Sequence, residues 1–206
     1  MQLYVDSNYV SPYAMSVFVA LHEKKLPFKI TTIDLSSGAA SAPAYAKISL
    51  THRVPTLVDG DFSLSESSAI TEYLHESYPG QALYPAEVKN RARARQVQAW
   101  LRSDFMPIRS ERTTVVVFYA PSATPLSDDA RSAAQKLFAG ATELLSHGDP
   151  HLCGKEWSIA DVDLAVMLNR LVLNGDSVPE SLAAYASRQW QRPSVQLWVN
   201  QERPSL

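Results

Sequence analysis

The pattern of hydrophobic and polar positions changes character along the chain. Up to residue 78, short β-rich runs alternate with stretches of helical periodicity, which predicts the order β-α-β-α-β-β-α. Ser11 followed by Pro12 marks the start of the first helix, and Asp59–Asp61 suits the turn of a hairpin between the last two strands. We expect Ser65 to cap the helix that ends this part of the chain.

Beyond residue 87 the pattern is almost entirely helical. Helices are expected over 88–104 and 127–146, and Pro107 should kink or break the first of them. Ser158–Asp161 has the spacing of a capping box, and the run that follows it is apolar on nearly all sides, which places that helix in the centre of a domain. The sequence therefore predicts a domain over 1–78, a linker over 79–87 and an all-helical domain over 88–206.

Composition and charge exclude several classes of protein. The 206 residues are 46% hydrophobic and 19% charged, as in ordinary globular proteins. The net charge of −2 argues against a protein that binds nucleic acid or a membrane surface, and no apolar run approaches the roughly 18 residues of a membrane helix. With one cysteine and no secretion signal we expect a cytoplasmic protein without disulfides, and the five histidines lack the spacing of a metal site.

Three segments of the first half carry candidate chemistry. Ser11 can donate a hydrogen bond to an anion at a helix N-terminus, or can simply cap its helix. Before Pro55, whose preceding bond can be cis, the Val54 backbone can pair with an extended ligand, or the proline can mark a plain edge strand. Glu66 and Ser67 can hold the ammonium and carboxylate of an α-amino acid, or form only a cap. Taken singly, each segment leaves both interpretations open.

Taken together and in this order, the segments resemble the cytosolic glutathione S-transferase family, serine type, over essentially the whole chain. The resemblance rests on Ser11–Tyr13, Arg53–Leu57, Glu66–Ile70 and the capping box at Ser158–Asp161, while 91–95 and 190–192 resemble the bacterial branch named YfcF. It implies an α/β plus all-α fold class: a thioredoxin-like N-terminal domain that binds glutathione, followed by an all-helical C-terminal domain that shapes the second-substrate pocket.

The resemblance also implies roles for individual residues. Ser11 would be the catalytic hydroxyl, which activates the thiol of the co-substrate glutathione for attack on a small electrophilic or peroxide substrate. The Val54 backbone would pair with the cysteinyl part, before a cis Pro55. Glu66 and Ser67 would hold the γ-glutamyl end, and Arg53 would lie near the glycine carboxylate. Where many relatives have Asn-Pro-x-Gly this chain has Ser-Leu-Thr-His at 49–52, which leaves the glycine-end contacts open. A homodimer is also implied.

Two functional classes stay open at this point. The first is an enzyme of glutathione conjugation, with glutathione-dependent peroxide reduction as a variant, and the second is a non-catalytic adaptor that keeps the fold. The intact Ser11, Glu66 and Ser67 favour the enzyme, because an adaptor has no physical need for all three. We expect Cys153 to be a packed small residue and not a nucleophile. Other side chains considered for the second pocket are expected to pack in the core, Phe105 and Trp198, or to lie on a solvated face, Arg109 and Arg112.

Overall fold

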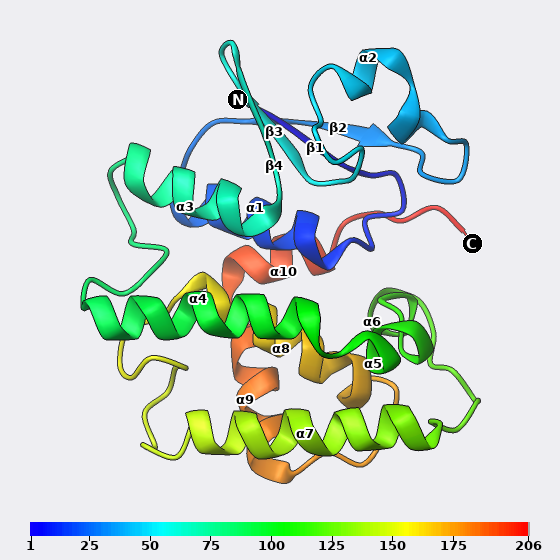
Figure 1. The fold of residues 1–206 in the computed structure, drawn as a ribbon, viewed down its shortest axis with the longest axis vertical. Coiled ribbons are helices and arrows are strands. Elements are labelled where there is room, and N and C mark those ends of the chain that lie inside the picture. The colour runs from blue at the N-terminus through cyan, green and yellow to red at the C-terminus, as the bar shows by residue number, and fades with distance from the viewer. Residues whose placement is uncertain (206) are drawn as a thin grey trace. The chain divides into compact units, whose positions relative to one another are not determined.

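The computed structural model describes residues 1–205, which form two compact units (Figure 1). The first unit contains Met1–Leu83 together with the C-terminal segment that starts at Pro193, and the second contains Tyr84–Arg192. The sequence had assigned everything from residue 88 onward to the helical domain. In the structure the last helix, α10 (Pro193–Val199), packs against α1 of the first unit, because that contact buries Val195 and Trp198.

The first unit has the predicted order of elements. These are β1 (Gln2–Asp6), α1 (Pro12–Glu23), β2 (Lys29–Ile33), a 3-10 turn η1 (Ala39–Ser41), α2 (Pro43–Ala46), β3 (Thr56–Asp59), β4 (Phe62–Ser65) and α3 (Ser67–Ser77). The order β-α-β-α-β-β-α is therefore confirmed, as is the thioredoxin-like fold class. The position of Pro12 in the first turn of α1 explains the sharp helix start, since proline lacks the N–H that this position does not use.

The four strands form one mixed sheet in the order β2-β1-β3-β4. β1 and β2 are parallel, whereas β3 runs antiparallel to both of its neighbours, with Tyr4 opposite Thr56 and Thr56 opposite Ser65. This register places the end of β1, the beginning of β3 and the end of β4 at the same end of the sheet. The segments that leave or enter the strands at this end are the ones that carry the candidate chemistry.

The helices α1, α3 and α10 bury the core of the first unit. From Ala14 to Leu21 every residue of α1 is buried, and Trp198 of α10 stacks edge-on against Phe18 with ring centroids 5.2 Å apart. The core packing expected for Trp198 is thus confirmed, with none of its surface exposed. At the other end of α1, the Lys24 ammonium donates to the carbonyl groups of His75 and Tyr78, which satisfies the C-terminus of α3.

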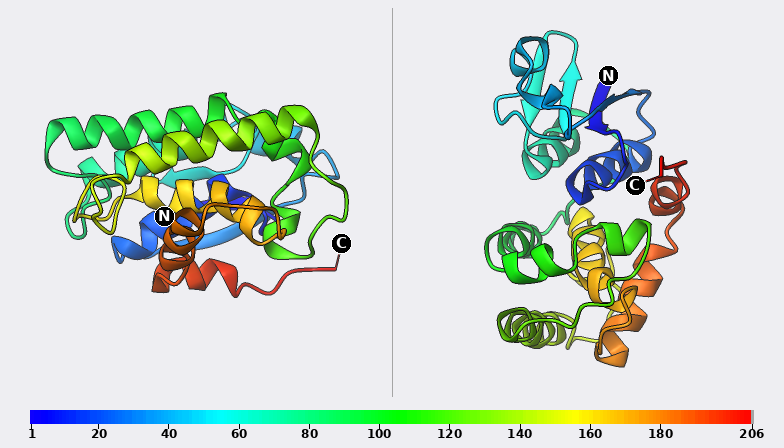
Figure 2. Two further views of the ribbon diagram at one scale, coloured as in Figure 1. Left: turned by 90° about the horizontal axis from the view of Figure 1, so that it is seen from below. Right: turned by 90° about the vertical axis from the view of Figure 1, so that its right-hand side faces the viewer.

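The second unit is built around one central helix. Its elements are α4 (Val88–Ser103), α5 (Met106–Glu111), α6 (Val115–Phe118), α7 (Asp128–Leu144), α8 (Ile159–Val172) and α9 (Glu180–Trp190). The apolar α8 is buried along nearly its whole length, and α4, α6 and α9 pack against it, as expected from its sequence (Figure 2). Pro107 lies in the first turn of α5, after a break from α4, so the predicted interruption is confirmed.

The predicted capping box at the start of α8 is present. The fully buried carboxylate of Asp161 accepts the Ser158 N–H at 2.8 Å and the Ser158 hydroxyl at 3.0 Å. It also accepts the Leu152 N–H at 2.7 Å and the Tyr185 hydroxyl at 2.8 Å, so that one side chain joins α8, α9 and the loop before them. The buried carboxylate of Asp161 is tolerated because four hydrogen-bond donors replace the water that it loses on folding.

Arg112 does not lie on a solvated face, which corrects the expectation. Its side chain is 2% exposed and forms a bidentate ion pair with Asp176, with nitrogen–oxygen distances of 2.6 and 2.9 Å. Burial of a guanidinium requires such a partner, so Arg112 holds α5 to the loop after α8. The half-buried Arg109 donates to the Arg102 carbonyl at 2.7 Å, and Phe105 is core as expected.

Candidate functional site

Ser11 is the N-cap of α1. Its Oγ accepts the Ala14 N–H at 3.2 Å, which confirms that it caps the helix. Since a hydroxyl has one donor hydrogen in addition to its acceptor lone pairs, this cap leaves the hydrogen of Ser11 available to donate to a ligand. The two interpretations of Ser11 are therefore compatible, and the half-buried side chain lies at the positive end of the helix dipole.

Asp6 holds the loop that leads to Ser11, and sequence reasoning missed it. The side chain is 3% exposed, and its two carboxylate oxygens accept the Val10 N–H at 2.7 Å and the Ser11 N–H at 2.9 Å. These hydrogen bonds fix the backbone on which the Ser11 hydroxyl is mounted. The available signal was an aspartate at the end of a strand, just before a short loop and a helix start, a place where Asp commonly accepts local N–H groups.

The C-terminal segment supports the same loop. The Arg203 guanidinium donates to the Tyr9 carbonyl at 3.3 Å and to the Trp198 carbonyl at 2.9 Å. The rings of Tyr9 and Trp198 meet edge to face, with centroids 5.6 Å apart. Residues from the two ends of the chain therefore position the segment before Ser11.

The second segment lies just before β3. The Val54–Pro55 peptide bond is cis, as the resemblance implies. Across residues 1–205, neither the N–H nor the carbonyl of Val54 makes a hydrogen bond within the protein, so both backbone groups can pair with a ligand. Arg53 presents an exposed side chain, while its carbonyl accepts hydrogen bonds from Tyr45 and Ser49.

The third segment differs in one respect from the prediction. Ser65 is the last residue of β4, and the N-cap of α3 is Glu66, not Ser65. Glu66 has φ +73° and ψ 113°, which a residue with a side chain rarely adopts, and its side chain is exposed. Such backbone strain is typical of functional sites. Within the described chain no side chain caps α3, so its first turn, which begins at Ser67, can accept an anion from a ligand.

The sheet brings these three segments to one end. Ser11 follows the end of β1, Arg53 and Val54 precede β3, and Glu66 and Ser67 follow β4. β1, β3 and β4 are neighbours in the sheet, so the three segments lie side by side along one edge of the first unit, at this end of the strands. They supply the Ser11 hydroxyl, the unpaired N–H and carbonyl of Val54, and the start of α3, which has no side-chain cap. An extended ligand with a carboxylate at one end fits this arrangement of groups.

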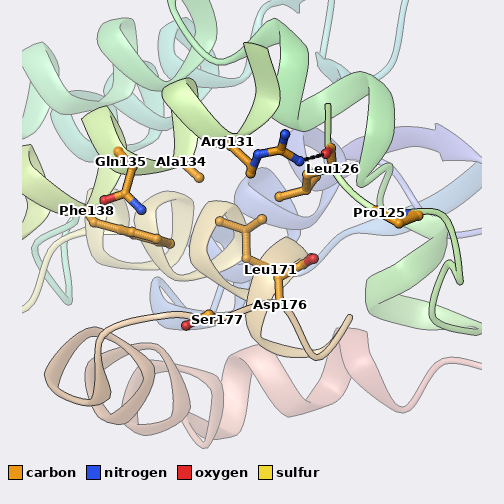
Figure 3. Close-up of a pocket in the computed structure, with 9 residues that line it drawn as sticks. All are labelled: Pro125, Leu126, Arg131, Ala134, Gln135, Phe138, Leu171, Asp176 and Ser177. Atoms are coloured by element: carbon orange, nitrogen blue, oxygen red, sulfur yellow. Dashed lines mark hydrogen bonds between the residues drawn. The ribbon is translucent and has the colours of Figure 1, made fainter. Parts of the chain in front are cut away.

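A separate hollow of about 340 Å³ belongs to the second unit alone (Figure 3). Phe138 and Leu171 give it an apolar wall, and Arg131 donates to the Leu126 carbonyl beside it. The Asp176 carboxylate at its border is already paired with Arg112. None of the five predicted site residues lines this hollow.

Cys153 is half-buried in the second unit, and its Sγ donates to the Asn90 carbonyl at 3.3 Å. Burial, with a smaller contribution from the charge of Asp161, raises the pKa of the thiol to about 11. At neutral pH the thiolate fraction of Cys153 is then lower than that of an ordinary thiol by a factor of about 100 or more. Cys153 therefore has the character of a packed residue and not of a nucleophile.

We predict that an alkylating reagent such as iodoacetamide modifies Cys153 at least about 100 times more slowly than it modifies free glutathione at neutral pH. The measurement is the rate of mass increase of the intact protein, with free glutathione in the same buffer as reference. Cys153→Ala should retain full turnover. Labelling at the rate of the free thiol would contradict the assignment.

Within residues 1–205, no helix is both long and apolar enough to cross a membrane. Nor does this part of the chain contain a group of three or more His, Cys, Asp and Glu side chains placed to hold a metal ion.

Comparison with known proteins identifies the class. Residues 7–82 match the family described as glutathione S-transferase, N-terminal domain, and residues 87–202 match glutathione S-transferase, C-terminal domain. The chain therefore belongs to the glutathione S-transferase family.

Individual relatives agree with this assignment. The chain is 31% identical to glutathione S-transferase 1 of Dianthus caryophyllus over 80% of its length and 74% of that protein. It is 31% identical to a maleylacetoacetate isomerase of Dictyostelium discoideum over 84% of its length and 81% of that protein. A crystal structure of a Burkholderia glutathione transferase homologue with bound glutathione is 46% identical, with a TM-score of 0.78 over 97% of this chain and 96% of that one.

Proposed function

We propose that the protein is a glutathione S-transferase of the serine type, in which the Ser11 hydroxyl stabilises the thiolate of bound glutathione. The observation that carries the proposal is the edge of the first unit where the Ser11 hydroxyl, the open Val54 backbone and the uncapped start of α3 lie together. The similar Burkholderia protein, which binds glutathione, supports the choice of ligand.

Each part of glutathione finds a complementary group along this edge. The extended cysteinyl part pairs with the N–H and carbonyl of Val54, as an added strand would. The α-carboxylate of the γ-glutamyl end binds at the N-terminus of α3 with the help of Ser67, and its ammonium group binds the Glu66 carboxylate. The exposed Arg53 side chain attracts the glycine carboxylate.

The chemical task of the site is to favour a thiolate at neutral pH. A free thiol has a pKa of about 8.5, and lowering it by about 2 requires roughly 2.7 kcal/mol of preferential thiolate stabilisation. A hydrogen bond to a charged group contributes about 1.5–3 kcal/mol, and a helix N-terminus adds about 0.3–1 kcal/mol. Ser11 at the start of α1 supplies both contributions, so the mechanism needs no general base.

The thiolate then reacts as a nucleophile. With an electrophilic carbon, the sulfur forms the new carbon–sulfur bond while the leaving group departs with its electron pair. With a peroxide, the sulfur attacks one oxygen and displaces the other, which takes up a proton and leaves as an alcohol or as water, while the glutathione becomes a sulfenic acid. The thiol of a second glutathione then attacks the sulfenic sulfur, which forms the disulfide and releases water. Conjugation is the main activity that we propose, and peroxide reduction is its variant.

The test combines binding with turnover. The protein should bind to immobilised glutathione, elute with free glutathione, and conjugate a chloronitroaromatic substrate. Binding without turnover on a panel of electrophiles and peroxides would favour the alternative of a non-catalytic adaptor. Absence of glutathione binding would contradict the proposed transferase.

Glu66 provides a test of the γ-glutamyl contact. Glu66→Ala and Glu66→Gly both remove the carboxylate that faces the ammonium group, so each should raise the Kd for glutathione about tenfold or more. The glycine variant should be more stable than the alanine variant by about 1 kcal/mol or more, because glycine adopts a positive φ without strain. Calorimetric titration and chemical unfolding measure the two effects. Equal stability of the alanine and glycine variants would contradict the strain at Glu66.

We further propose that the protein acts as a homodimer in the cytoplasm and belongs to the bacterial YfcF branch. A single half-buried cysteine, Cys153, suits a reducing compartment. Light scattering of the purified protein should give twice the mass of the chain, and a monomeric mass would contradict the dimer.

A further inference from the structure

Four hydroxyl groups meet in the interior of the first unit, directly behind the proposed glutathione site. They belong to Tyr45 of α2, Ser49 of the loop after it, Thr56 of β3 and Ser65 of β4, and all four residues are buried. We call them the hydroxyl cluster. A core normally excludes such groups unless they satisfy one another, so a cluster of four in one place requires an explanation.

The hydroxyl groups of the cluster lie within hydrogen-bond distance of one another. Oxygen–oxygen distances are 2.9 Å between Thr56 and Ser49, 3.2 Å between Ser49 and Ser65, and 3.4 Å between Thr56 and Ser65, so the three hydroxyls form a closed triangle. The Tyr45 hydroxyl lies 3.0 Å from that of Thr56. Hydrogen bonds in such a chain strengthen one another in a medium of low dielectric constant.

The cluster contacts both segments that we assign to glutathione. On one side, the hydroxyl oxygens of Tyr45, Ser49 and Thr56 lie 2.8, 3.2 and 3.3 Å from the Arg53 carbonyl oxygen, and the next residue is Val54. Because each hydroxyl has one hydrogen, a hydroxyl that donates to this carbonyl acts only as an acceptor within the cluster. On the other side, Ser65 is joined directly to Glu66, the strained N-cap of α3. Thr56 and Ser65 are also a cross-strand pair, so the same two residues fix the register at this end.

We propose that the hydroxyl cluster is a positioning network, which fixes the Val54 backbone relative to the start of α3 so that both halves of glutathione bind to a preformed site. This inference rests on the proposed function. The four residues act through Arg53 and Glu66 and do not themselves contact the ligand. Without the network, ligand binding must order two independent segments, and the affinity falls because that ordering opposes association.

The effect should be confined to binding. Thr56→Val keeps the shape of the side chain and removes its hydroxyl, so the Kd and KM for glutathione should rise about tenfold, the equivalent of about one lost hydrogen bond. At saturating glutathione, kcat should stay within about twofold of the wild-type value. The pKa of the bound thiol should stay within about 0.3 of the wild-type value. The reason is that the Ser11 loop is held by Asp6 and Arg203, which are not part of the cluster.

Matched variants separate positioning from a general loss of stability. Thr56→Ser retains the hydroxyl and should bind glutathione nearly as well as the wild type. Thr31→Val makes the same replacement in the edge strand β2, on the far side of β1 from β3, and should leave the Kd unchanged. Ser65→Ala removes another corner of the triangle, and the double variant Thr56→Val/Ser65→Ala should weaken binding by clearly less than the product of the two single effects.

The outcomes distinguish this inference from the function on which it rests. The expected result is a raised Kd with unchanged kcat and thiol pKa in Thr56→Val, and rescue in Thr56→Ser. If the wild type binds glutathione and Thr56→Val, still folded by circular dichroism, binds it equally well, only the positioning role is overturned. A fall in kcat or a raised thiol pKa at saturating glutathione would also overturn it. If the wild type itself fails to bind, the proposed function falls as well.

Discussion

Replacement of Ser11 by glycine should raise the pKa of the bound glutathione thiol by about 1–2 and lower turnover at neutral pH by up to about 25-fold. The factor follows from ionisation: about three-quarters of a thiol with a pKa near 6.5 is thiolate at pH 7, against about 3% at a pKa of 8.5. Glycine is chosen because it substitutes for a serine N-cap at a cost of a few tenths of a kcal/mol, whereas alanine costs about 1 kcal/mol. The ultraviolet absorbance of the thiolate, titrated against pH, measures the pKa.

Two further variants make the result specific. Ser11→Thr keeps the hydroxyl and should preserve most of the pKa depression. Ser16→Ala, in the same helix, removes a buried hydroxyl that has no hydrogen-bond partner among residues 1–205, and should change neither the pKa nor kcat. An unchanged thiol pKa in Ser11→Gly would remove Ser11 from the mechanism while leaving the fold and the binding groups in place.

The largest loss of stability is expected from Asp161→Ala. The substitution leaves the N–H groups of Leu152 and Ser158 and the hydroxyl of Tyr185 buried without an acceptor. Each unsatisfied donor costs about 1–3 kcal/mol, so the free energy of unfolding should fall by about 4 kcal/mol or more. Urea unfolding followed by tryptophan fluorescence measures the change.

The control for Asp161 is an exposed aspartate in the first turn of another helix. Asp128→Ala, in the first turn of α7, removes a side chain that is 94% exposed and forms an ion pair with Arg131 at the surface. That change should cost less than about 0.5 kcal/mol. If the two variants lost similar stability, the four hydrogen bonds of Asp161 would not be the source of its effect.

The sequence predicted what depends on neighbours along the chain. Ser11 before Pro12 and Ser158 before Asp161 are local signals, since a cap and its helix lie within four residues, and both are confirmed. The cis bond before Pro55 was also anticipated. The same local reasoning failed at Ser65, because the true N-cap, Glu66, adopts a positive φ that no residue preference would suggest.

What the sequence left out depends on contacts between distant residues. The hydroxyl cluster joins Tyr45 to Ser65 through strand register, and Arg112 finds Asp176 across 64 positions of the chain. Arginine and serine are surface residues by preference, so their burial here follows only from partners that the fold supplies. Asp6 is an intermediate case between these two groups. Its hydrogen bonds are local in the sequence, but many aspartates in similar loops accept no such bonds, so the sequence alone does not single it out.

The return of the chain to its first unit has a consequence for how the protein is made. Trp198 completes the core around Phe18, and Arg203 fastens the segment before Ser11, yet both are synthesised after the whole of Tyr84–Arg192. The ribosome must therefore synthesise the chain as far as Arg203 before the core of the first unit is complete, and the second unit can fold ahead of it. A premature stop after Arg192 would leave the helical half complete and damage the other one.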